Sequence, residues 1–396
     1  MKNLKNILVM WSMFLLCSSL MACKNNDRSK EIDFVENASN QEALKNLHGP
    51  KTNKHFIKVA LLLDTSNSMD GLINQAKAQL WEIVNELSYA KCGNDRPNLQ
   101  IALYEYGNDN LPAREGYIRQ VLGFSNDLDE ISEKLFSLTT NGGNEFCGEV
   151  IETSLKQLDW GNDRDDLKLL FIAGNEPFTQ GNVDYRDAIA DAKEKDVVVN
   201  TIFCGDYDQG ISGMWQDGAI RGDGDYMTIN HNRAIVHVVT PYDAVILKLN
   251  SRLNKTYIAY GSRGIAKMEL QSAQDTNAAS MNEEVAVKRA VSKSSRLYNN
   301  SNWDLVDAIA DKEIAIADLK EKDLPKELKG KSEKEIKSYI EEKRVERAKI
   351  QGEIQSLNTM RKQYIATKQK EESKDNLEAV MIQAIKKQAK RKNYSW

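Results

Sequence analysis

Apolar runs of strand length alternate with segments of helical period through the first two thirds of this 396-residue chain. Residues 58–63 carry a nearly continuous apolar run, as expected of a strand that is buried on both faces of a parallel sheet. Residues 68–90 then place their apolar side chains on one face of a helix. The same reasoning predicts strands at 99–106, 118–124, 167–173, 197–204 and 226–229, and helices at 127–138, 148–158, 183–195 and 241–253. This alternation predicts an α/β fold, with a doubly wound, mostly parallel sheet and helices on both faces.

The composition excludes several classes of protein. A net charge of −4 argues against a dedicated nucleic-acid binder, which usually presents a basic face. Five cysteines are too few for a disulfide scaffold, and at most one apolar run approaches the length of a membrane span. None of the common catalytic motifs occurs. The sequence therefore favours a binding or scaffolding protein over an enzyme, and no nucleic acid is expected among its partners.

The N-terminal residues predict export and lipid attachment. Two lysines precede a short apolar stretch over residues 7–20, which is the pattern of a secretory signal peptide; the alternative is a single uncleaved membrane anchor. Residues 20–23 (LMAC) then resemble the lipobox of bacterial lipoproteins. This resemblance implies that residues 1–22 are removed and that acyl chains on Cys23 anchor the protein to a membrane. We expect a lipid-anchored protein of the bacterial cell envelope at the outer membrane, on its periplasmic or its outer face.

Composition also divides the chain into regions. Residues 23–53 are polar and indicate a flexible tether. Residues 54–262 contain the alternating pattern, and residues 263–301, where glycine becomes scarce, are interpreted as a linker. Residues 302–396 are highly charged and predict a helical, coiled-coil-like region, although Lys343 and Arg347 interrupt its apolar seam. Packing on the preceding domain, partner binding and self-association are all compatible with such helices.

Three oxygen-bearing side chains follow the first predicted strand. Asp64, Ser66 and Ser68 occupy alternate positions where the chain leaves the strand and enters a helix. This spacing can aim a carboxylate and two hydroxyls at one point above the carboxyl edge of the sheet, which is where ligands bind in such folds. Hard oxygen ligands of this kind suit Mg²⁺, and other divalent cations are open alternatives.

An Asp-x-Ser-x-Ser motif after a buried strand resembles the metal-ion-dependent adhesion site of von Willebrand factor type A (VWA) domains, an integrin I-like fold. The order of elements across residues 54–262 fits such a domain. Three loops also look like those of bacterial VWA lipoproteins, namely 142–150, 173–181 and 213–219. The resemblance implies a VWA domain that recognises a protein ligand, whose carboxylate takes an open position on the bound cation.

The chain departs from the VWA pattern at two further parts of that site. The family usually has a threonine after the glycine pair of the second loop, whereas Asn144 and Glu145 follow it here. The family usually has an aspartate at the end of a later strand, whereas Asn175 and Glu176 lie there. Asn144, Glu145 and Asn175 are therefore candidate metal ligands, with Glu176 as an alternative. In the opposing interpretation the site is degenerate, Asp64 caps the following helix, and no metal binds.

Two cysteines are expected near the same edge. Cys147 opens a predicted helix and Cys204 ends a predicted strand, so the two can form a disulfide in an oxidising periplasm. The alternative is that these cysteines and Cys92 are buried thiols.

Two weaker motifs add little. Residues 206–217 place acids at three positions of a calcium-loop count, but the required glycine is absent, which favours a plain polar loop. Residues 64–66 look like the catalytic turn of aspartic proteases, but no second such turn occurs. We therefore expect a protein ligand to bind through the VWA domain. The alternative is a structural assembly subunit that acts through its C-terminal helices and carries a vestigial metal site.

Overall fold

The computed structural model describes residues 55–232, 238–368 and 377–396. The expected signal peptide, the lipidation residue Cys23 and the expected tether lie outside these ranges. None of the helices described within them is long and apolar enough to cross a membrane.

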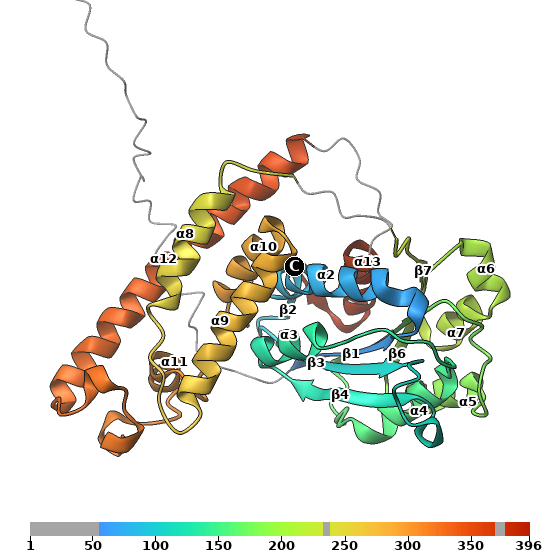
Figure 1. Cartoon of the computed structure of the whole chain (residues 1–396), viewed down its shortest axis with the longest axis horizontal. Coiled ribbons are helices and arrows are strands. Elements are labelled where there is room, and N and C mark those ends of the chain that lie inside the picture. Colours follow the sequence, from blue (N-terminus) through green and yellow to red (C-terminus); the bar gives the residue numbers. More distant parts are fainter. Residues whose placement is uncertain (1–54, 233–237, 369–376) are drawn as a thin grey trace, which may run out of the picture.

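A six-stranded sheet forms the centre of the α/β domain (Figure 1). Its strands are β1 (Phe56–Asp64), β3 (Asn98–Tyr106), β4 (Ile118–Ser125), β5 (Leu167–Gly174), β6 (Val198–Phe203) and β7 (Asp223–Thr228). They lie in the order β4-β3-β1-β5-β6-β7, and all neighbours are parallel except β4, which is antiparallel to β3. β1 lies between two strands and is covered on both faces, which explains its nearly unbroken apolar run. The predicted doubly wound, mostly parallel sheet is confirmed.

Helices cover both faces of this sheet and enclose two separate cores. One face carries α4 (Cys147–Gln157), α5 (Tyr185–Glu194) and α7 (Trp215–Arg221), and the other carries α2 (Asp70–Leu87) and α3 (Leu128–Phe136). Successive side chains of β1 alternate between the cores: Val59, Leu61 and Leu63 join the core of α2, whereas Ala60 and Leu62 join that of α4. The carboxyl edge of the sheet is left to the connecting loops.

The segment 263–301, interpreted above as a linker, instead contains two packed helices, α9 (Gly264–Met281) and α10 (Glu283–Lys293). Three valines of α10 are buried in the same core as α2: Val285, Val287 and Val291. The Asn85 side chain of α2 also donates to the main-chain oxygen of Lys288 at 3.0 Å. The linker prediction is wrong because α9 buries Gln271 and Gln274 rather than a regular apolar stripe, so its sequence resembles exposed chain.

The longest helix of the described chain is α12 (Glu333–Lys368). It packs on α8 (Asp243–Asn254), α10 and α11 (Leu305–Ala310), as Figure 1 shows. Three of its apolar side chains belong to the same core as the sheet: Ile350, Ile354 and Leu357. Arg347 is also buried, and its Nη1 lies 2.6 Å from Asp304 and 2.7 Å from Asp307. Arg347, which interrupts the predicted apolar seam, therefore forms buried ion pairs within the chain. The C-terminal helices pack against the α/β domain.

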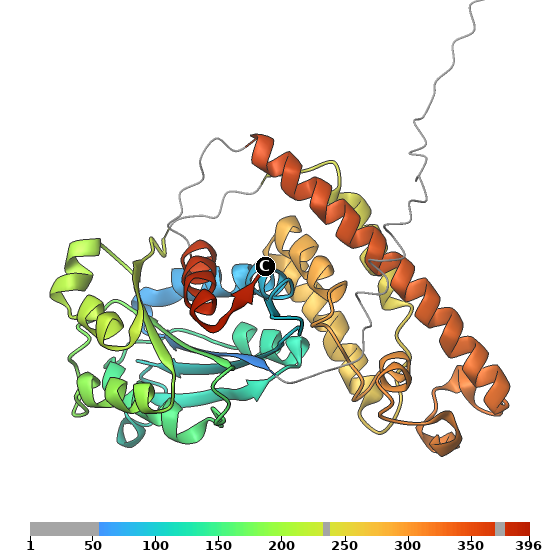
Figure 2. The same ribbon diagram turned by 180° about the vertical axis from the view of Figure 1, so that it is seen from behind.

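The chain returns to the α/β domain at its end (Figure 2). α13 (Leu377–Ala389) packs on α2 and β7, and β8 (Tyr394–Ser395) pairs with β2 (Lys91–Cys92). Five side chains of α13 are buried in the core of α2: Leu377, Met381, Ala384, Ile385 and Ala389. The core of the domain therefore does not end at residue 262. Residues 377–396 complete it, and helices α8 to α12 lie between β7 and α13 in the sequence.

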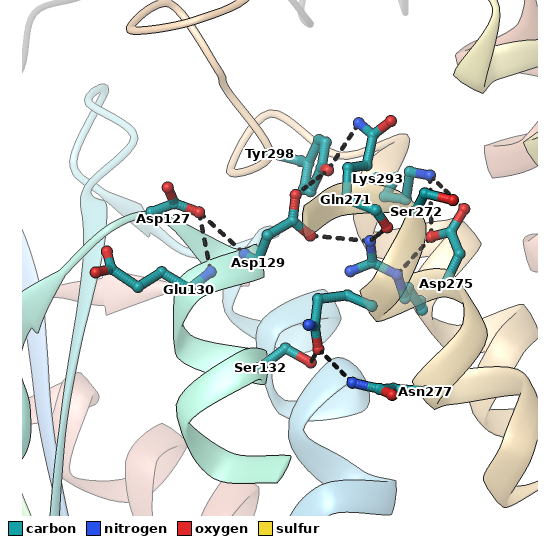
Figure 3. A network of polar contacts seen from close by, with 12 residues as sticks. Asp127, Asp129, Glu130, Ser132, Gln271, Ser272, Asp275, Asn277, Lys293 and Tyr298 are labelled. Carbon is teal, nitrogen blue, oxygen red and sulfur yellow. Dashed lines mark hydrogen bonds and ion pairs between the residues drawn. The ribbon is translucent and has the colours of Figure 1, made fainter. Parts of the chain in front are cut away.

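A buried polar network joins α3 to α9 and α10 (Figure 3). Arg289 lies 2.9 Å from Asp129 and 2.6 Å from Asp275, and Lys293 lies 2.9 Å from Asp275. Burial lowers the pKa of Lys293 to about 8, although the charge of Asp275 opposes this shift. Burial alone would raise the pKa of Asp275, but Lys293 and Arg289 outweigh it and hold this pKa well below its usual value. The buried charges thus compensate one another and join α3 of the α/β domain to the helices α9 and α10.

Candidate functional site

Loops from several elements meet at the carboxyl edge of the sheet, as the α/β fold predicts. Main-chain hydrogen bonds join them in pairs. The amide of Asn141 donates to the oxygen of Thr65 at 3.0 Å, which ties the loop before α4 to the end of β1. The amide of Cys204 donates to the oxygen of Gly174 at 2.8 Å, which ties the ends of β6 and β5.

Asp64 lies at the centre of this edge, at the last position of β1, and it is fully buried. Its Oδ1 accepts a hydrogen bond from the main-chain amide of Ser66 at 2.7 Å. Its Oδ2 is buried and has no hydrogen-bond partner in the described part of the chain. No side-chain cap is present at the start of α2, so the structure does not support a capping role of Asp64 for that helix. An unpaired, buried carboxylate oxygen is costly unless something else binds it.

Glu145 lies beside Asp64 and is also buried. Burial raises the pKa of Asp64 well above its usual value, and the charge of Glu145 raises it further. Burial likewise raises the pKa of Glu145, although its interactions with Asp64 and Ser66 oppose the shift. Within the described ranges, neither carboxyl has an ion pair with lysine or arginine. Such a pair is satisfied by a shared proton or by a bound cation.

Two glycines make room for this pair. At Gly107 a Cβ would lie 2.8 Å from Glu145 Cγ and 2.9 Å from Asp64 Oδ1, and the φ of +76° also favours glycine. At Gly174 a Cβ would lie 2.5 Å from the Tyr106 hydroxyl and 3.2 Å from Asp64 Oδ2. The sequence analysis missed Tyr106 and Gly107. Both lie at the carboxyl end of the predicted strand 99–106, and this position could have indicated that they belong to the site.

The two serines differ in exposure: Ser66 is buried, whereas Ser68 is exposed. Ser66 Oγ is 3.4 Å from Ser68 Oγ, and Asn175 Nδ2 donates to Ser68 Oγ at 3.1 Å. The Oδ1 of Asn175 is buried and has no hydrogen-bond partner among the described residues. Two orphaned oxygens, those of Asp64 and Asn175, thus belong to one loop cluster with two hydroxyls and a second carboxyl.

The remaining candidates contribute less. Asn144 is exposed, and its side chain makes no hydrogen bond with the other candidates in the described structure. Glu176 is exposed, but its main-chain amide donates to Glu145 Oε2 at 3.3 Å and so positions that carboxyl. The structure thus brings together five of the six predicted ligands: Asp64, Ser66, Ser68, Glu145 and Asn175.

The donor set fits a hard divalent cation. Carboxylate, hydroxyl and amide oxygens are the ligands that Mg²⁺ and Ca²⁺ prefer, and Mg²⁺ needs only one or two carboxylates because it keeps several waters. Burial of Asp64 and Glu145 without a basic partner makes positive charge favourable at this point.

The predicted disulfide between Cys147 and Cys204 does not form, and both residues are free thiols, as is Cys92. Cys147 belongs to the core of α4, whereas Cys204 belongs to the core of α2, on the other face of the sheet. Burial raises the pKa of both thiols well above its usual value, which keeps them protonated and inert. The prediction is wrong because two positions at one sheet edge can still point to opposite faces.

Residues 206–217 form two short helices rather than a calcium loop. Asp206 caps α6 (Tyr207–Ser212) by accepting from the amides of Asp208 and Gln209 at 2.9 and 3.2 Å. Asp217 in α7 pairs with Arg221 at 2.6 Å. Asp206 and Asp217 are therefore used in capping and pairing.

This chain is similar to one known domain family and to several solved structures. Residues 58–211 match the sequence profile of the von Willebrand factor type A domain. No curated protein matches the chain. Proximal thread matrix protein 1 from the mussel byssus is a similar solved structure, with 14% identity over 44% of this chain and 41% of that one and a TM-score of 0.32. The match thus spans about two fifths of the mussel protein.

Two bacterial structures are similar at the same level. An aerotolerance-related membrane protein from Bacteroides fragilis has 16% identity over 44% of this chain and 93% of that one, with a TM-score of 0.30. The pilus adhesin SpaC from Lactobacillus rhamnosus GG has 12% identity over 46% and 28% of the chains, with a TM-score of 0.34. The family profile and the observed sheet order carry the assignment: this chain contains a von Willebrand factor type A domain.

Proposed function

We propose that this chain is a lipid-anchored protein of the bacterial cell envelope that binds a protein ligand through the carboxyl edge of its VWA sheet. A divalent cation, Mg²⁺ in the first instance, completes this binding site. The observation that carries the proposal is the buried pair Asp64 and Glu145, with the Asp64 Oδ2 left unpaired. The VWA match supports a role in protein interaction, and the hydroxyls and the amide of the same loops supply further oxygen ligands.

Each side chain has a part in this proposal. Asp64 and Glu145 supply the charge that holds the cation, and Ser66, Ser68 and Asn175 supply neutral oxygens. A bound cation supplies an open coordination position for a carboxylate of the protein ligand. Because Ser68 is exposed, a ligand can approach the site from the side of Ser68.

Asp64→Asn is expected to separate metal binding from folding. In EDTA the variant should be as stable as the wild type or more stable, because it removes a buried carboxyl that burial and Glu145 disfavour. Mg²⁺ should raise the thermal midpoint of the wild type. At a hundredfold excess over Kd, binding should add about 2.7 kcal/mol to the free energy of unfolding. Mg²⁺ should not raise the thermal midpoint of Asp64→Asn.

The exposed acid Asp187 on α5 provides the matched control, because Asp187→Asn removes a carboxylate that is not among the candidate ligands and should keep the full Mg²⁺ response. Identical midpoints of the wild type in Mg²⁺ and in EDTA would refute metal binding.

Cys23→Ser is expected to abolish lipid attachment. When the full-length protein is expressed in a bacterium with a labelled fatty acid, the wild type should carry the label and sediment with membranes. The variant should lack the label, because serine has no thiol to acylate. Label on the variant would contradict the lipobox assignment of residues 20–23.

The alternative of an assembly subunit that acts through its C-terminal helices remains a prediction. The apolar faces of α12 and α13 are already buried against the chain's own core. Assembly by this route would therefore use their exposed polar faces.

A further inference from the structure

A second group of metal-ligating side chains lies at the opposite, amino edge of the sheet. His55 immediately precedes β1, and Asp163 and Asp165 lie in the loop that leads from α4 into β5. One ligand atom from each of these three residues lies within 4.8 Å of the other two. None of the three belongs to the Asp64 site.

The imidazole of His55 has an unused nitrogen in this group. Its Nδ1 is buried and has no hydrogen-bond partner in the described residues. Asp163 Oδ2 is 3.9 Å from this nitrogen, which is too long for a hydrogen bond. The other oxygen of Asp163 accepts from the amide of Asp165 at 2.9 Å, and this contact orients Oδ2 toward the imidazole.

Basic side chains nearby are bound to other groups. Lys58 and Lys168 donate to the main-chain oxygens of Asp159 and Gly161 at 2.9 and 2.8 Å. Lys392 donates to main-chain oxygens of the same loop and to Asp196. These contacts hold the backbone of the loop. In the described ranges, no lysine or arginine forms an ion pair with the carboxylates of Asp163 and Asp165.

We propose that His55, Asp163 and Asp165 bind a divalent transition-metal ion, with Zn²⁺ as the best match. One imidazole and two carboxylates are common zinc ligands, and a water or a partner group takes the fourth position. Mg²⁺ and Ca²⁺ prefer oxygen ligands alone, so the two sites of the chain select different ions. Bonds of about 2.0–2.1 Å bring tetrahedral ligand atoms to about 3.3 Å from one another. The two exposed aspartates can close the remaining gap by rotation.

Metal at this point would join both ends of the folded chain. The loop that carries Asp163 and Asp165 also receives the C-terminal residues, because the Tyr394 hydroxyl donates to the main-chain oxygen of Asp165 at 2.9 Å. The same hydroxyl lies 3.3 Å from the oxygen of Phe56, the first residue of β1. The ion would therefore fix the start of β1 to the loop that holds β8.

The test is a calorimetric titration of the full-length Asp64→Asn protein with Zn²⁺, so that the first site does not contribute. We expect one bound ion and a raised thermal midpoint. Adding His55→Gln or Asp163→Asn should weaken Zn²⁺ binding at least about tenfold. Adding Asp159→Asn, an exposed acid of the same loop, should leave the affinity unchanged.

Circular dichroism of each variant without metal shows whether the fold is kept. Asp163→Asn alters an exposed side chain and should not disturb folding. It therefore still tests the proposal if His55→Gln does not fold. Equal Zn²⁺ affinity of Asp163→Asn and Asp159→Asn, or no binding by the parent protein, would overturn the proposal.

Discussion

Arg347→Ala is expected to lower the free energy of unfolding by about 3–5 kcal/mol. Arg347 is buried, donates to Asp304 and Asp307, and also donates to the main-chain oxygen of Thr256 at 2.7 Å. Its guanidinium stacks 4.1 Å from the ring centroid of Tyr257. Alanine would remove all of these contacts and leave two buried carboxylates without a counter-charge.

The loss should depend on pH. Burial already raises the pKa of Asp307 to about 6, although Arg347 opposes this shift. Without Arg347 the folded-state pKa of Asp307 rises further above the unfolded value. The folded variant then binds protons that its unfolded state does not, so its stability increases as pH falls from 8 to 5.

Urea unfolding at pH 8 and pH 5 measures both effects. Arg344→Ala is the matched control, because Arg344 lies one turn away on α12 and pairs with Glu341 on the exposed surface. Such pairs contribute about 0–1 kcal/mol. If the two alanine variants were equally stable at pH 8, the buried ion pairs of Arg347 would not stabilise the fold.

Ile385→Ala in α13 is expected to cost about 2–5 kcal/mol. Ile385 is 1% exposed and lies in the core that contains the sheet and α2, although it comes from the last 12 residues of the sequence. Removing most of this side chain leaves a cavity beneath α13 and loosens the contact of α13 with α2. The same argument predicts that truncation before residue 377 exposes this core rather than releasing an independent tail.

Gln383→Ala on the exposed face of α13 is the control for this helix, and its effect should stay within about 0.5 kcal/mol. Chemical unfolding followed by tryptophan fluorescence compares the two variants. An Ile385→Ala protein as stable as Gln383→Ala would mean that α13 does not belong to the VWA core.

The candidate site was predictable in part. Asp64, Ser66 and Ser68 follow one strand, so local spacing sufficed to group them. Glu145 and Asn175 were named from their loops, but only the fold shows that Glu145 lies beside the buried Asp64 and that Asn144 is exposed. Tyr106 and Gly107 shape the same site, and their contribution depends on β3 lying next to β1.

The alternation of apolar runs determined by itself that the chain forms a doubly wound sheet, because a strand buried on both faces must be apolar throughout. The Asp-x-Ser-x-Ser spacing likewise placed oxygen ligands at one edge. Only the tertiary structure decided which helices complete the domain. α10 and α13 join the core of α2 from distant parts of the sequence, and Arg347 is buried only because Asp304 and Asp307 meet it there. The physical reason is that local periodicity shows which face of one element is buried. Which elements share a core, and which buried charges meet, depends on contacts between elements that are distant in the sequence.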